Sequence, residues 1–199
     1  MRRNALLDAV LIPDPSLRVH VYRANIRPGV DLAEIDPGDG DRLQALFADE
    51  GTLLKGVAHE SNLSPWSDEL LDYDLHKVRP GLLDELPREL AKYLAMAELR
   101  SNETTFSIWR AKDDESWTVG RAEGPEEEFD GADDLLSEIC ITSAEYSRWV
   151  EEYLEVDVSR SAVSAAFSGT VSVRELIRLL GHREREAEIL SDLHAHGLV

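Results

Sequence analysis

The residues Thr104–Glu123, TTFSIWRAKDDESWTVGRAE, constrain the fold of this chain more than any other stretch. Two short runs rich in Phe, Ile, Trp, Thr and Val flank the polar residues 112–115, a pattern that predicts a β-hairpin with a four-residue loop. Cross-strand neighbours in such a hairpin follow from the position of the loop. The expected pairs are Ile108 with Val119, Trp109 with Thr118 and Arg110 with Trp117.

Alternation of side chains along each strand then divides the hairpin into two faces. One face carries the apolar residues Phe106, Ile108, Trp117 and Val119. We expect this face to be buried in the core, because a stable monomer does not leave such a surface in water. Trp109 lies on the other face and is the one large apolar side chain there.

The rest of the chain predicts an α+β fold: a small mixed or antiparallel sheet around the central hairpin (about 104–123), packed against several helices. With 199 residues, we expect a single α+β domain spanning 1–199, with a helical C-terminal subdomain from about 143 to 199. Capping signatures at Thr142 with Glu145 and at Ser172 with Glu175 predict two of its helices. The apolar stripe of the first, which includes Trp149, is expected to share one core with the hairpin.

Other elements are predicted from shorter patterns. The N-terminal residues suit a short helix, and the alternation over Leu17–Arg23 predicts a half-buried strand. Asp41 and Gln44 have the spacing of a capping box, which predicts a helix that ends before Gly51. A strand is expected over 52–58, and a helix from about Leu82 whose regular part begins at Pro87.

The charge of the chain is strongly acidic. There are 40 Asp and Glu residues against 21 Lys and Arg residues, for a net charge of −19. Such a surface repels nucleic acid and membranes and favours solubility and a basic protein partner, and the alternative interpretation is that the charge only keeps the protein soluble. Between Asp113 and Asp134 there are ten acidic residues and one basic residue, Arg121, so the charge is concentrated in this segment.

The composition and the absence of known motifs limit the possible localisation and functional class of the protein. The chain has one cysteine and no apolar run near the roughly 18 residues of a membrane span, so we expect a cytoplasmic protein. No Gly-rich phosphate loop, Walker motif or Gly-x-Ser-x-Gly occurs, and we expect no cofactor. These absences favour a non-enzymatic protein.

The hairpin residues FSIWRAKDDESWTVG and the later block YSRWVEEYLEVDV resemble a family of uncharacterised bacterial proteins with a WR–loop–WxxG hairpin. The resemblance covers about residues 104–199 and implies the fold alone, because the family brings no known activity. The run 86–94, LPRELAKYL, resembles the Leu-Pro helix of SMI1/KNR4-type immunity proteins. That second resemblance implies an immunity or antitoxin role.

Taken together, these observations favour an acidic interaction protein that binds a basic protein partner. An exposed Trp109 would anchor the partner, since Trp is over-represented at interface hot spots, and the acidic segment would steer it. The expected partner-binding residues are Trp109, Asp113, Asp114, Glu126, Glu127, Glu128, Asp130, Asp133 and Asp134. A second interpretation keeps Trp109 in the core, beneath the helix over 143–155.

The alternative class is a metal-dependent hydrolase. Asp72, Asp74 and His76 alternate in sequence, so an extended chain would present two carboxylates and an imidazole on one face. A divalent cation held there could activate water. The acidic residues of 36–41 do not have the spacing of an EF-hand and read as a turn, and His59 lacks the second histidine of a zincin.

Overall fold

The computed structural model describes residues 1–67, 78–123 and 129–199. The chain divides into two compact units. One unit combines Met1–Ala24 with Ser137–Val199, and the other is Asn25–Leu136. The C-terminal helices therefore form their unit together with the N-terminal segment. The α+β fold class predicted from the sequence is confirmed.

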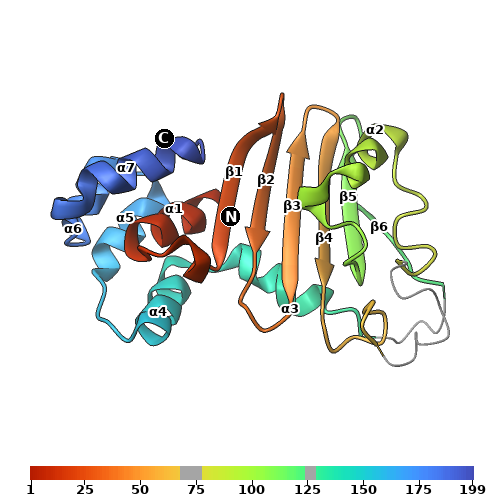
Figure 1. Cartoon of the computed structure of the whole chain (residues 1–199), viewed down its shortest axis with the longest axis horizontal. Helices are drawn as coiled ribbons and strands as arrows, with labels where there is room; N and C mark the ends of the chain where they lie inside the picture. Colours follow the sequence, from red (N-terminus) through yellow and green to blue (C-terminus); the bar gives the residue numbers. More distant parts are fainter. Residues whose placement is uncertain (68–77, 124–128) are drawn as a thin grey trace. The chain divides into compact units, whose positions relative to one another are not determined.

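Six strands form a sheet in the order β1-β2-β3-β4-β5-β6 (Figure 1), and strands β2 to β6 with the last residues of β1 belong to the Asn25–Leu136 unit. Consecutive strands are neighbours, and every pairing from β2 to β6 is antiparallel. Local hairpins therefore build most of the sheet, and only the β4 to β5 connection is long. The strands are β1 (His20–Arg27), β2 (Val30–Ile35), β3 (Arg42–Ala48), β4 (Gly51–Val57), β5 (Phe106–Ala111) and β6 (Thr118–Val119).

The central hairpin has the predicted register. Ile108 pairs with Val119 and Trp109 pairs with Thr118 across β5 and β6. The predicted strand over 52–58 is confirmed as β4, and the strand expected over Leu17–Arg23 begins later, at His20. Alternation is a reliable signal in β5, where Ile108 and Arg110 are more exposed than Ser107 and Trp109.

The helix expected from Asp41 is wrong, because this segment forms the central strand β3. Leu43, Gln44, Ala45 and Leu46 are all buried, so the strand is covered on both faces. A strand buried on both faces does not alternate apolar and polar residues. The spacing of its apolar residues can then match the spacing expected on one side of a helix. The Asp41 carboxylate does not cap a helix; it accepts a hydrogen bond from the His59 backbone N–H (2.8 Å).

An apolar row crosses four strands on one face of the sheet. The register places Leu32, Leu46, Leu53 and Trp109 directly opposite one another in turn. The helix α2 (Arg88–Ala91) and the 3₁₀ turns Lys92–Ala95 and Ala97–Leu99 supply Leu90 and Leu99 to the same cluster. In Figure 1, α2 lies in front of the sheet, and α3 (Ala132–Ser137) lies behind it.

Trp109 belongs to this row and is 2% exposed. The expectation that it is an exposed anchor for a partner is therefore wrong. The cover over Trp109 also differs from the one that we expected, since residues of 86–99 pack in its cluster and the helix after Thr142 does not. The indole of Trp109, on β5 next to the last strand, is the largest side chain of the core under α2.

The second unit is helical. It contains α1 (Arg2–Leu11), α4 (Ser143–Leu154), α5 (Arg160–Ser168), α6 (Val173–Leu179) and α7 (Glu186–Ala195), with 3₁₀ turns at Pro15–Leu17, Glu138–Cys140 and Arg183–Arg185. The capping box of Thr142 and Glu145 is confirmed, and Ser172 caps α6 by accepting from the Glu175 N–H. Leu7 and Leu11 of α1 pack with Tyr146 and Val150 of α4.

Trp149 packs against this helical core, whereas Trp109 of the hairpin belongs to the separate cluster under α2. The expectation of one core shared by the hairpin and the α4 stripe is therefore wrong. Each unit buries its own apolar residues, which is the usual property of a compact folding unit.

Candidate functional site

A groove of about 650 Å³ runs along the outer edge of the sheet, next to β6. Its apolar part is Trp117 and Val119, and its rim carries the charged residues Asp84, Glu85, Arg121 and Glu123. Trp117 is 46% exposed and Val119 is 51% exposed. Large apolar side chains at this exposure, gathered in one concave surface, mark a binding site more often than a scattered surface residue does.

The backbone of β6 determines what this groove can bind. Gly120 N–H donates to Ser107 C=O (2.9 Å), so the hydrogen-bonded pairs of the β5–β6 ladder are Ser107 with Gly120 and, two residues on, Trp109 with Thr118. Antiparallel ladders alternate hydrogen-bonded and non-hydrogen-bonded pairs. Val119 sits in a non-hydrogen-bonded pair, and its N–H and C=O therefore point away from β5, toward the groove.

The part of β6 that lies along the groove is short. Beyond Gly120 the chain is covered by residues 80–81, because Arg121 N–H donates to Gly81 C=O (3.2 Å) and Glu123 N–H donates to Pro80 C=O (2.8 Å). Gly81 has a φ of +90°, and a Cβ built on it would meet the Arg121 carbonyl oxygen at 2.0 Å. Only glycine permits this close approach, so the local sequence fixes where the groove ends.

Trp117 projects from the sheet face opposite to Trp109. The Arg110 guanidinium lies over its ring, with 5.5 Å from Cζ to the ring centroid. The sequence predicted that Phe106, Ile108, Trp117 and Val119 would share one buried face, and this is wrong at the outer end. Phe106 is 1% exposed, but Val119 belongs to β6, the last strand of the sheet among the described residues, and Trp117 directly precedes that strand.

The rim of the groove is acidic. Asp84, Glu85 and Glu123 are exposed, and Arg121 is the one basic residue among the groove's lining. Asp113 and Asp114, two of the predicted partner-binding residues, are also exposed and belong to the β5–β6 turn that leads to Trp117. Part of the predicted acidic surface therefore lies on the same hairpin as the groove.

The other end of the acidic segment lies elsewhere on the unit. Thr105 Oγ1 donates to the Asp130 carbonyl (2.6 Å), which places Asp130 at the start of β5, whereas Asp113 follows its end. The six residues of β5 span roughly 20 Å. Glu126, Glu127 and Glu128 lie outside the described residues. The described acidic side chains therefore do not form a single patch.

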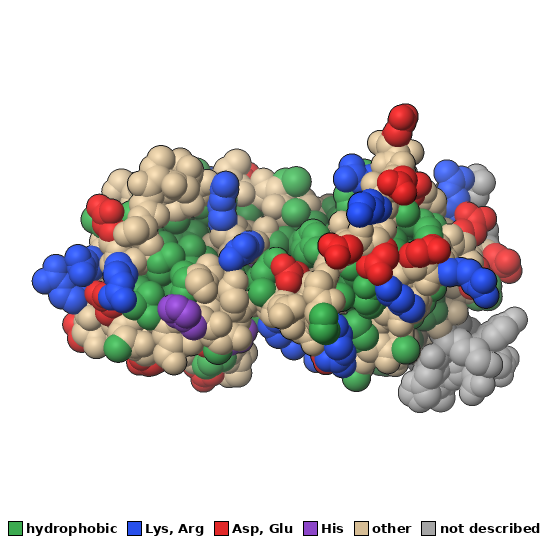
Figure 2. All heavy atoms as spheres, turned by 90° about the horizontal axis from the view of Figure 1, so that it is seen from above, with side chains coloured by type: hydrophobic (Ala, Val, Ile, Leu, Met, Phe, Trp, Pro, Cys, Tyr) green, Lys and Arg blue, Asp and Glu red, His purple; other side chains and the backbone are tan. Residues whose placement is uncertain are grey.

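Asp130 also has a local structural role. Its Oδ1 accepts a hydrogen bond from the Ala132 N–H (2.8 Å) at the beginning of α3. Asp133 and Asp134 follow in the first turn of that helix, where acidic side chains interact favourably with the helix dipole. Figure 2 shows the end of this unit that carries α2, and there acidic and basic side chains are interspersed. On the face in view, acidic side chains outside the 113–134 segment therefore contribute to the charge as well.

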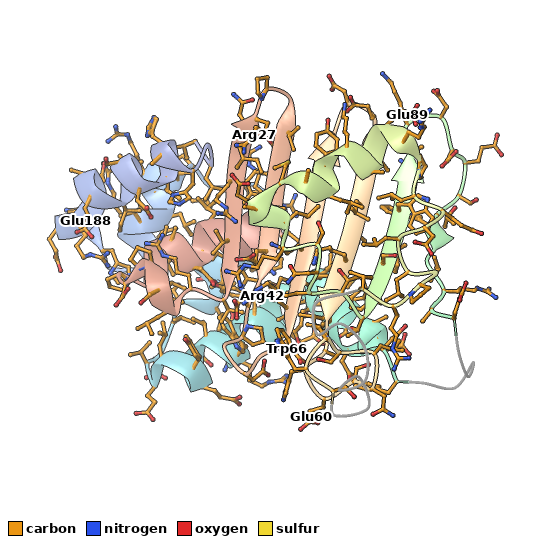
Figure 3. All side chains as sticks on the ribbon, turned by 45° about the vertical axis from the view of Figure 1, so that its right-hand side comes forward. Arg27, Arg42, Glu60, Trp66, Glu89 and Glu188 are labelled. Carbon is orange, nitrogen blue, oxygen red and sulfur yellow. The ribbon has the colours of Figure 1, made fainter. Side chains whose placement is uncertain are left out.

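The group of residues that could hold a metal ion differs from the predicted one. Asp72, Asp74 and His76 lie outside the described residues. Within the part of the chain that is described, Asp39, Asp41 and His59 bring one ligand atom each within 4.8 Å of one another. The group is at the end of the sheet opposite to Glu89, near the labelled Glu60 in Figure 3.

His59 in this group already has a partner. Its Nδ1 lies 2.7 Å from Asp41 Oδ1, and this hydrogen bond raises the pKa of His59 above its ordinary value. Both side chains are partly exposed, and exposed carboxylates commonly gather without a metal. The arrangement holds the 58–60 turn to the 39–41 turn, which is sufficient reason for its geometry.

Sequence reasoning missed a row of buried and half-buried polar residues beside the apolar row. Glu34, Gln44, Lys55 and Ser107 lie opposite one another across β2 to β5. Lys55 is 2% exposed, and its Nζ donates to the Glu103 carbonyl (2.7 Å). Burial lowers the pKa of Lys55 to about 7. Gln44 Nε2 donates to Glu34 and to the Glu98 carbonyl (2.7 and 2.8 Å), so the row ties residues 98–103 to the sheet.

Comparisons with protein-family models, with curated proteins and with solved structures found no match to this chain. The resemblances to the WR–loop–WxxG family and to SMI1/KNR4-type proteins therefore stay predictions. None of the helices in the described residues is long and apolar enough to cross a membrane.

Proposed function

We propose that this chain is a non-enzymatic interaction protein that binds an extended, basic segment of a protein partner in the groove along β6. The observation that carries this proposal is the exposed Trp117, set in a groove at the open edge of the sheet. The proposal keeps the basic protein partner expected from the charge. It replaces Trp109 by Trp117 as the aromatic anchor.

The shape of the groove supports an extended ligand. An unpaired strand edge can accept a further strand, whose main chain supplies hydrogen bonds while alternate side chains enter pockets. Val119 offers the outward N–H and C=O for such a contact, and Trp117 on one side of it offers apolar area. Covering an indole contributes substantially to binding, because aromatic anchors dominate the energetics of interfaces.

The charge of the rim supports a basic ligand. Three carboxylates surround the groove against one guanidinium, and the chain as a whole carries −19. Complementary charge mainly accelerates association and excludes acidic competitors. An immunity or antitoxin protein that neutralises a basic toxin is one form of this proposal.

A selection from a random peptide display library tests the proposal. We expect wild-type protein to enrich peptides rich in Lys and Arg with apolar residues at alternate positions. The same peptides should lose binding to Trp117→Ala and keep it to Trp66→Ala, a matched control. Trp66 is 56% exposed and lies at the end of the sheet away from Glu89 (Figure 3). Enrichment of acidic peptides, or equal binding to Trp117→Ala, would contradict the proposal.

A further inference from the structure

The groove along β6 has two walls, and they lie on opposite faces of the sheet. Trp117 and Val119 are two positions apart and project to one face, because side chains alternate along a strand. Thr118, the residue between them, pairs with Trp109 and shares its face, which is the face that α2 covers (Figure 1). The chemistry of each wall therefore determines which side chains of a bound strand it accepts.

Residues 82–86 form the wall on the Trp109 face. Ser107, which is two positions from Trp109 on β5 and shares its face, donates from its hydroxyl to the Leu82 carbonyl oxygen. A Cβ on Gly120 would collide with the same carbonyl oxygen. The Leu82 backbone therefore lies directly against this face of the sheet, beside β6.

The polar groups of this wall are two carboxylates. Asp84 and Glu85 line the groove, and both are exposed. Asp84 already has a role in the local turn, because its Oδ2 accepts a hydrogen bond from the Gly81 N–H (2.8 Å). Within the described part of the chain, Glu85 has no hydrogen bond or ion pair. The Glu85 carboxylate is therefore the one on this wall that is available to a ligand.

The wall on the opposite face is apolar, and it consists of Trp117 and Val119. The remaining charged residues of the lining, Arg121 and Glu123, follow Gly120. There the backbone is covered by residues 80–81, so these two side chains belong to the closed end of the groove. Along its open part, the groove thus has a carboxylate on one side and apolar surface on the other.

A strand added to β6 must place its side chains alternately against the two walls. Val119 directs its N–H and C=O toward the groove, and a ligand residue opposite Val119 projects to the same face as Val119. The two neighbours of that residue project to the face of Glu85, whether the added strand is parallel or antiparallel. Lys and Arg suit these two positions, because their long apolar stems carry the charge out to a carboxylate.

We infer that the groove selects a segment in which an apolar residue opposite Val119 lies between two basic residues, and that Glu85 is the residue that selects for the basic ones. This inference rests on the proposed function. It adds the order of the ligand's side chains and the carboxylate that recognises them.

The test uses the full chain and two peptides of equal composition and charge, each flanked by Gly-Ser: the alternating Lys-Val-Lys-Val-Lys and the blocked Lys-Lys-Lys-Val-Val. Steering by the acidic surface acts equally on both. We expect the alternating peptide to bind at least about tenfold more tightly in isothermal titration calorimetry, because its alternation matches both walls at every position. Its valine methyl groups should also give NOEs to the Trp117 indole.

Charge reversal tests the role of Glu85. Glu85→Lys should weaken binding of the alternating lysine peptide at least about tenfold and strengthen binding of Glu-Val-Glu-Val-Glu relative to wild type. Glu89→Lys is the matched control, since Glu89 is also exposed but does not line the groove. It should change the affinity for either peptide by less than about threefold. Circular dichroism verifies that both variants fold.

The contrary outcomes separate this inference from the proposed function. Equal binding of the two lysine peptides, with both lost in Trp117→Ala, would overturn the inference and leave the proposed function intact. Equal effects of Glu85→Lys and Glu89→Lys would overturn the role of Glu85. If wild type binds neither peptide although the library selection enriches basic peptides, the inference alone is wrong. If the selection enriches no basic peptide either, the proposed function is wrong as well.

Discussion

The hydroxyl of Tyr146 in α4 donates to the Asp8 carboxylate in α1 over 2.7 Å, joining two residues that are 138 positions apart. Asp8 is fully buried, and Tyr146 is also 0% exposed. Burial and the neighbouring Asp8 raise the pKa of Tyr146 well above its ordinary value, so this hydroxyl stays a donor across the accessible pH range.

Removing the Tyr146 hydroxyl should therefore destabilise the protein. Tyr146→Phe leaves the Asp8 carboxylate buried with one hydrogen bond fewer, and we expect the free energy of unfolding to fall by about 1–3 kcal/mol in urea denaturation. Tyr153→Phe is the control, because the Tyr153 hydroxyl also donates a hydrogen bond, to the Leu17 carbonyl oxygen (2.9 Å), but the residue is 42% exposed. Equal losses in the two variants would contradict a structural role for the buried pair.

Lys55 predicts how stability depends on pH. Burial lowers its folded-state pKa to about 7, while the unfolded chain keeps the ordinary value near 10.4. Between those values the unfolded chain binds one more proton, so stability should rise with pH, by up to about 1.4 kcal/mol per unit from this group. Below pH 7 both states are protonated and the burial of the charge destabilises the fold.

Lys55→Met should abolish the part of the rise in stability with pH that Lys55 causes. The gain in stability of the variant over wild type should therefore be larger at pH 6 than at pH 9. Urea unfolding at several pH values between 6 and 9, for wild type and variant, measures the difference in slope. Lys112→Met, which changes an exposed lysine, is the control. Parallel curves for wild type and Lys55→Met would show that Lys55 titrates normally in the folded state.

The contact between His59 and Asp41 can be tested by titration. The hydrogen bond to Asp41 raises the pKa of His59, so the pair is favoured at low pH and is lost as pH rises through the folded-state value. In Asp41→Asn we expect the pKa of His59, followed by NMR, to fall toward its ordinary value. An unchanged pKa would mean that the pair does not form in solution.

How much of this structure the sequence predicts depends on how local each feature is. The register of Ile108 with Val119 and the Thr142–Glu145 capping box were both predictable, because neighbouring residues determine them. The strand β3 was mistaken for a helix, since both of its faces are buried and alternation disappears.

Alternation also shows which residues share a face, but not which face is covered. This is why the sequence left Trp109 open between an exposed anchor and a core residue and placed Trp117 in the core, whereas Trp109 is buried and Trp117 is exposed. The Asp8–His20–Tyr146 network gave no local signal at all. Its members come together only when the N-terminal segment packs on α4.

The acidic rim should control how fast a basic ligand associates. Replacing Asp84 and Glu85 with Asn and Gln and Glu123 with Gln should change stability by no more than about 0.5 kcal/mol per site, because all three are exposed. Association with a selected basic peptide should slow and become less sensitive to salt, as stopped-flow at two salt concentrations measures.

A matched variant separates local steering from total charge. Asp133→Asn, Asp134→Asn and Glu138→Gln remove the same charge in and directly after α3, at residues that are also exposed. We expect this variant to associate nearly as fast as wild type. If both triple variants slow association equally, only the net charge of the chain matters and the rim has no special role.

The most direct test of the proposed binding mode is amide hydrogen exchange at Val119 in the complex with a selected basic peptide. If the peptide adds as a strand to β6, the outward N–H of Val119 acquires a hydrogen bond and its exchange slows by at least about tenfold. If the peptide binds and Val119 exchanges at the rate of the free protein, while protection occurs at another surface, the groove along β6 is not the binding site.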